Sequence, residues 1–61
     1  MVIHIVAEDF ACNVDAIEVA DVITAHSRAV ELSNVHNVDF VVILVDGMPM
    51  VKFVDGTEVK L

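Results

Sequence analysis

The chain has 61 residues, of which 57% are hydrophobic, and its formal net charge at pH 7 is −7. A chain of this length is expected to form one domain, residues 1–61. Because ten acids face three lysines and arginines, the surface should repel phosphate backbones and anionic lipids, which argues against direct binding of nucleic acid. The longest uninterrupted apolar run, residues 40–45, is far shorter than the roughly 20 residues that span a bilayer, so no membrane attachment is expected.

The hydrophobic content is higher than a domain of this size can hide by itself. Such a small domain buries only about 60% of the surface that its unfolded chain exposes, and disulfides, metals or oligomerisation commonly supplement its core. Cys12 is the single cysteine, so an internal disulfide is excluded, and no ligand spacing predicts a metal or a cofactor. We therefore expect a homo-oligomer, most simply a dimer. A single free cysteine also favours a cytoplasmic location.

The first half of the chain predicts a strand followed by a helix. Residues 1–7 are predicted to form the strand, because apolar side chains surround a single histidine. Residues 8–13 form a polar connection in which Asp9 or Asn13 can cap the helix. Residues 14–32 contain neither glycine nor proline. Asp15, Glu18 and Asp21 lie toward the start of this stretch and His26 and Arg28 toward its end, as the helix dipole prefers. A helix is therefore predicted over residues 14–32.

The second half repeats an apolar run that ends in Asp-Gly, first at residues 42–47 and then at residues 51–56. Asp-Gly supplies the positive φ angles that tight hairpins need, so both dipeptides predict turns. Three antiparallel strands follow, over residues 38–45, 49–54 and 57–61. The first of them is apolar on both sides except for Asp39, which is typical of a strand covered on both faces.

The second predicted hairpin has a defined register. A two-residue turn at residues 55–56 sets Val54 opposite Thr57 and Lys52 opposite Val59. Pro49 leaves the register of the first hairpin open, because proline has no N–H for the strand ladder.

The predicted fold is α+β, with the order β-α-β-β-β. One helix packs on one face of a small mixed four-stranded sheet, and the first strand runs parallel to the strand after the helix. The other face of the sheet is left without cover, so the chain is expected to oligomerise through it. The residues expected in this interface are Phe40, Val42, Leu44, Val51 and Phe53.

This layout resembles the tautomerase family of small β-α-β subunits. The stretches MVIHIVAED and VDFVVILVD occupy the places of that family's two parallel strands. The resemblance implies a similar fold and an oligomer. It does not extend to the activity, because Val2 stands where the family has a catalytic N-terminal proline, and the sole arginine, Arg28, lies in the predicted helix.

Four residues are natural candidates for a nucleophile, a base or a ligand: His4, Cys12, His26 and His36. None of them lies at a metal-ligand spacing, and the chain has no glycine-rich phosphate loop, so no catalytic residue is predicted.

The acidic residues are a stronger signal. A dense negative region comprises Glu8, Asp9, Asp15, Glu18 and Asp21. It is either a solvated surface in a favourable position for the helix dipole or a patch that docks on a basic protein.

The sequence therefore predicts a small acidic homo-oligomeric binding protein. It would be an accessory or inhibitory protein of the virus-encoded type, acting through contacts with a basic partner. The alternatives are a tautomerase-like enzyme or a protein that sequesters a small ligand in a pocket between subunits. A structural subunit of a larger assembly is a third class.

Overall fold

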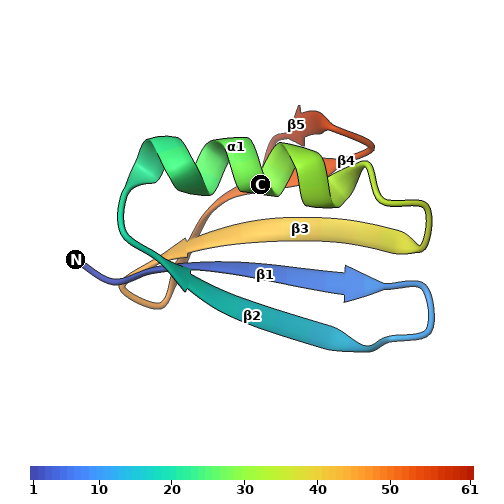
Figure 1. Cartoon of the computed structure of the whole chain (residues 1–61), viewed down its shortest axis with the longest axis horizontal. Coiled ribbons are helices and arrows are strands. Elements are labelled where there is room, and N and C mark those ends of the chain that lie inside the picture. Colours follow the sequence, from blue (N-terminus) through green and yellow to red (C-terminus); the bar gives the residue numbers. More distant parts are fainter.

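The computed structural model describes residues 1–61 and shows one helix lying across one face of a five-stranded sheet (Figure 1). The elements are β1 (Ile3–Asp9), β2 (Val14–Val19), α1 (Val22–Ser33), β3 (Val38–Val45), β4 (Met48–Val54) and β5 (Thr57–Val59). The strand order across the sheet is β2-β1-β3-β4-β5, and every neighbouring pair is antiparallel. The single helix, α1, has 12 residues and does not qualify as a membrane-spanning segment.

The predicted β-α-β-β-β order with a mixed four-stranded sheet is wrong, because an additional strand precedes the helix. The order is β-β-α-β-β-β, and β1 pairs with β3 in the antiparallel direction. The helix instead connects β2 to β3, and β1 lies between these two strands in the sheet. The fold therefore departs from the tautomerase-like arrangement at the two strands on which that resemblance depended.

Residues 14–19 form a strand because the turn before them reverses the chain. The Asp9 carboxylate accepts hydrogen bonds from the backbone N–H groups of Ala11 and Asn13, both at 2.9 Å, and from the Asn13 side chain at 3.1 Å. Cys12 adopts a left-handed conformation with φ of 67°. Asp9 thus closes a hairpin instead of capping a helix, and the residues that follow pair with β1.

Helix α1 begins at Val22, after a cap at Asp21. The Asp21 carboxylate accepts hydrogen bonds from the Thr24 backbone N–H at 2.7 Å and from the Thr24 hydroxyl at 3.1 Å. Ala25, Ala29 and Ser33 form the buried stripe of the helix, at a spacing of four residues. Their small side chains let the helix axis lie close to the sheet.

The hydrophobic core lies between α1 and the sheet face that the helix covers. It consists of Ile3, Ile5, Ala25, Ala29, Val41, Ile43 and Phe53. The sheet register explains this set, because Ile5 of β1 lies opposite Ile43 of β3, and Val41 lies opposite Phe53 of β4. Alternate residues of neighbouring strands thus point to the same side of the sheet.

Both predicted Asp-Gly turns are confirmed. Asp46 and Gly47 have φ angles of 50° and 81°, and Asp55 and Gly56 have φ angles of 52° and 76°, which are the signs of a type I′ turn.

The predicted register of the second hairpin is also confirmed, with Val54 opposite Thr57 and Lys52 opposite Val59. In the first hairpin the register shifts between Ile43 and Leu44, and Pro49 lies beside this irregularity.

Candidate functional site

The sheet face opposite α1 has no cover, and we call it the open face. The register places on it Val14, Ala16 and Glu18 of β2, His4, Val6 and Glu8 of β1, Phe40, Val42 and Leu44 of β3, Lys52 and Val54 of β4, and Thr57 and Val59 of β5. Val6, Val42 and Leu44 at its centre are half-buried by their neighbours in the sheet. The open face is therefore a mainly apolar surface that no other part of the chain covers.

The open face carries little net charge. The ionised residues that the ladder pairs on this face are Glu8, Glu18 and Lys52, which sum to −1 with His4 neutral, whereas the whole chain has −7. Asp39 lies at the bulge of β3, is not paired in the ladder and is counted with the rest of the chain. The Lys52 ammonium lies 4.7 Å from the centroid of the Phe40 ring, in a cation–π contact. The rest of the chain thus holds −6 of the formal charge.

The residues predicted to form the oligomer interface divide between the two faces. Phe40, Val42 and Leu44 lie on the open face. Val51 packs against the core on the helix side, and Phe53 is only 1% exposed there. The division follows from the alternation of side chains in β4, which turns Phe53 toward α1 and Lys52 away from it.

The five acids of the predicted patch do not form one surface. Glu8 and Glu18 lie on the open face, and Asp15 of β2 faces the helix side. Asp9 and Asp21 hold the hairpin turn and the helix start. Glu8 and Glu18 thus share the open face, and Asp9 and Asp15 share the space between α1 and the β1–β2 hairpin, so the five acids do not form a single docking patch.

Asp9 and Asp21 have lowered pKa values, and hydrogen bonds cause both shifts. The backbone N–H of Asn13 makes the largest contribution to the lowered pKa of Asp9, and the backbone N–H of Thr24 does so for the pKa of Asp21. Hydrogen bonds that favour the ionised carboxylate stabilise it against protonation. The hairpin turn and the helix cap therefore account for the presence of acids at positions 9 and 21.

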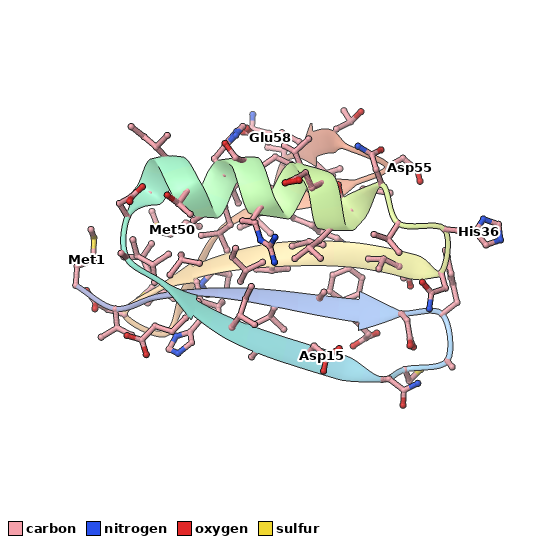
Figure 2. All side chains as sticks on the ribbon, viewed as in Figure 1. Met1, Asp15, His36, Met50, Asp55 and Glu58 are labelled. Atoms are coloured by element: carbon pink, nitrogen blue, oxygen red, sulfur yellow. The ribbon has the colours of Figure 1, made fainter.

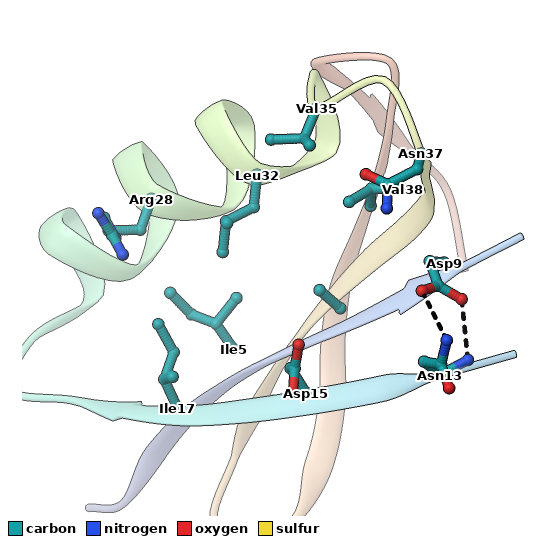
Figure 3. A pocket seen from close by; sticks show the side chains of 11 residues that line it. Ile5, Asp9, Asn13, Asp15, Ile17, Arg28, Leu32, Val35, Asn37 and Val38 are labelled. Atoms are coloured by element: carbon teal, nitrogen blue, oxygen red, sulfur yellow. Dashed lines mark hydrogen bonds between the residues drawn. The ribbon is translucent and has the colours of Figure 1, made fainter. Parts of the chain in front are cut away.

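A cavity of about 340 Å³ lies between α1 and the β1–β2 hairpin (Figure 3). It exists because β2 extends beyond the part of the sheet that α1 covers (Figure 1). Its apolar lining consists of Ile5, Ala7, Ile17, Leu32, Val35 and Val38, and its polar lining of Asp9, Asn13, Asp15, Arg28 and Asn37. The cavity lies within one chain, unlike the pocket between subunits that the sequence suggested.

Two charged side chains in the cavity lining have no partner. Arg28 and Asp15 make no side-chain hydrogen bond, and the one ion pair in the chain joins His26 Nε2 to Glu58 Oε1 at 4.0 Å. The sequence did not predict that Arg28 and Asp15 line the same cavity, because both residues fell in one predicted helix. The available signal was the Asp21-x-x-Thr24 cap, which separates a strand containing Asp15 from a helix containing Arg28.

The candidate nucleophiles and bases lie on separate elements. His4 is on β1, His26 is on α1, Cys12 is exposed in the hairpin turn, and His36 projects from the loop after α1 (Figure 2). No group of three or more His, Cys, Asp or Glu residues is arranged to hold a metal ion. The geometry therefore offers no assembled catalytic group.

Comparisons with known proteins give no match to a family model, to a curated protein or to a solved structure.

Proposed function

We propose that this chain is a small acidic homodimeric binding protein of the accessory or inhibitory type, located in the cytoplasm. It pairs through the open face and presents its remaining acidic surface to a basic protein. The observation that carries the proposal is the separation of surfaces: the open face is apolar with a charge of −1, and the rest of the chain carries −6.

The unfilled apolar surface supports a partner on the open face. The intramolecular core contains seven buried hydrophobic residues, although 57% of the chain is hydrophobic. A standard interface takes about 800 Å² from each partner, which is roughly a fifth of the 4043 Å² that this chain exposes. The open face offers the contiguous, weakly charged centre that such interfaces require.

The charges of the open face favour a second copy of the chain as the occupant. β3 is the central strand, and β1 and β4 flank it. A two-fold axis parallel to β3 therefore packs two open faces with β1 of one subunit over β4 of the other, within the usual aligned geometry of packed sheets. The register sets Lys52 level with Val42 and Glu8 level with Phe40, one residue pair further along the strands. Because the Lys52 ammonium reaches back over the Phe40 ring, it comes within reach of Glu8 of the partner, and the contact is made twice.

The surface outside the open face supports a basic protein as the further partner. After dimerisation each chain still presents a formal charge of −6, so the dimer presents twice that, −12. A potential of one sign steers an oppositely charged partner and repels nucleic acid and anionic lipid.

The dimer is tested by placing a carboxylate in the middle of the open face. Val42→Asp should convert the dimer to a folded monomer at micromolar concentration, because dimerisation would bury an unpaired charge. Native mass spectrometry measures the mass, and circular dichroism verifies the fold.

The matched control is Ile23→Asp, at a position on α1 that is 81% exposed and away from the open face. It should leave the dimer mass unchanged. A monomeric native chain, or a Val42→Asp chain that still dimerises, would contradict the proposal.

A further inference from the structure

The cavity beside α1 has the size and the lining of a small-molecule site. Its volume of about 340 Å³ lies at the lower end of the range for ligand pockets, roughly 300–1,000 Å³. Figure 3 shows Ile5 and Ile17 extending from the sheet toward Leu32 of the helix, so an apolar group can lie among these three side chains.

The walls of the cavity carry opposite charges. Arg28 stands on α1 and Asp15 on β2, and neither has a partner within the chain (Figure 3). Asp9 also lines the cavity, but its carboxylate already accepts three hydrogen bonds in the hairpin turn. Arg28 and Asp15 are thus the charged groups that are free to bind a ligand.

Arg28 and Asp15 are both exposed at the edge of the cavity, so a ligand that fills it removes part of the water around each charge. A partner of opposite charge on the ligand offsets that loss. An anion would leave Asp15 uncompensated, and a cation would leave Arg28 uncompensated. A zwitterion compensates both, since a carboxylate fits the planar fork of a guanidinium and an ammonium group can donate to a carboxylate. A ligand of zero net charge is also not repelled by a chain of −7.

We propose that the cavity binds a small zwitterion with an apolar side group, of the size of an apolar amino acid. Its carboxylate binds Arg28, its ammonium group binds Asp15, and its apolar group contacts Ile17 and Leu32, above the buried Ile5. This site is independent of the proposed dimer, because the cavity and the open face lie on opposite sides of the sheet.

The first test compares three probes of nearly the same shape in an NMR titration of the ¹⁵N-labelled chain. L-Leucine should shift the amide signals of Ile17, Arg28 and Leu32 and saturate at millimolar concentration. N-acetyl-L-leucine lacks the ammonium group, and L-leucinamide lacks the carboxylate. Each should bind about ten-fold more weakly or worse, as expected for the loss of one hydrogen bond between charged groups.

The second test removes each charge from the protein. Arg28→Gln and Asp15→Asn should each weaken L-leucine binding by about ten-fold or more. The matched controls Lys60→Gln and Asp55→Asn change the net charge by the same amounts outside the cavity lining, and they should bind like the native chain. The monomeric Val42→Asp chain should also bind normally, which separates this site from the dimer.

The proposal is overturned if L-leucine causes no saturable shift at millimolar concentration. That result is expected if Arg28 pairs with Asp15 and so closes the cavity. Equal binding of a blocked analogue would overturn it as well. So would native affinity in both Arg28→Gln and Asp15→Asn.

Discussion

Single polar side chains hold the points at which this chain changes direction. Asp9 closes the β1–β2 turn, and Asp21 begins α1. Ser33 joins the end of the helix to the β4–β5 turn, because its hydroxyl donates to the Val30 carbonyl at 2.9 Å and accepts from the Gly56 N–H at 2.8 Å. Each residue satisfies backbone groups that would otherwise lack partners.

Ser33→Ala should destabilise the fold by about 1–3 kcal/mol, because the part-buried Gly56 N–H loses its acceptor. Ser27→Ala is the matched control, since Ser27 is exposed on the same helix and makes no side-chain hydrogen bond. Urea unfolding measures both variants. Equal stability of the two variants would show that the contact with Gly56 contributes nothing.

The lowered pKa values of Asp9 and Asp21 predict a loss of stability in acid. Both carboxyls have an ordinary pKa of 3.8 and a lower one in the fold. Their contribution is therefore complete above pH 3.8 and is lost as the pH falls through the lower, folded values. The free energy of unfolding should decrease over that range.

The double variant Asp9→Asn/Asp21→Asn tests this assignment. Asparagine can still accept the capping hydrogen bonds, but it does not titrate, so the variant should fold at neutral pH with a weaker pH dependence below 3.8. Chemical unfolding at a series of pH values gives the slope. If the free energy of unfolding changes with pH as steeply as in the native chain, other carboxyl groups cause the acid sensitivity.

At the scale of elements, the two Asp-Gly turns have the same conformation but different surroundings. A Cβ atom at Gly47 would meet nothing within 4 Å, whereas a Cβ atom at Gly56 would lie 2.5 Å from the Asn34 side-chain nitrogen. The Asn34 amide donates to the Val30 carbonyl at 3.2 Å, near the end of α1. The second hairpin is thus fitted closely against the helix end, and the first is free.

Gly47→Ala should cost roughly 1–2 kcal/mol, which is the left-handed strain alone. Gly56→Ala should cost more, because the methyl group also displaces Asn34. In an Asn34→Ala background the two glycine substitutions should cost the same. Thermal unfolding of the five variants measures this, and an equal cost in the native background would exclude the close contact.

The two halves of the chain differ in how well their elements could be predicted. Asp-Gly and the apolar run of residues 38–45 are local signals, and the structure has that strand and both turns where they were predicted. Residues 14–19 fit a helix or a strand equally well by composition, and the choice depends on pairing with β1. The strand order of the sheet and the presence of the cavity both depend on β2, which the sequence did not predict.

At the scale of the whole molecule, the sheet separates a side that the helix covers from a side that nothing in the chain covers. Charge follows the same division, since the open face has a formal charge of −1 out of −7. The proposed dimer uses one side, and the proposed ligand cavity uses the other. Substitutions should therefore be able to abolish dimerisation without affecting ligand binding, and the reverse.

Charge reversal across the open face tests the orientation of the dimer. Glu8→Lys and Lys52→Glu should each weaken the dimer by about ten-fold, because like charges then face each other, and the double variant should recover most of this loss. Lys60→Glu, at the C-terminus, is the control for net charge. Sedimentation equilibrium measures the dissociation constants. Additive losses in the double variant would exclude the axis parallel to β3.

The sequence alone determined the two Asp-Gly turns, the strand at residues 38–45 and the excess of apolar over buried residues, because each depends on local backbone preferences or on composition. The tertiary structure decided that residues 14–19 pair with β1, that Phe53 belongs to the core, and that Arg28 and Asp15 stand on opposite walls of a cavity. These outcomes depend on contacts between residues far apart in the chain. Local propensity does not record which partner a strand will find.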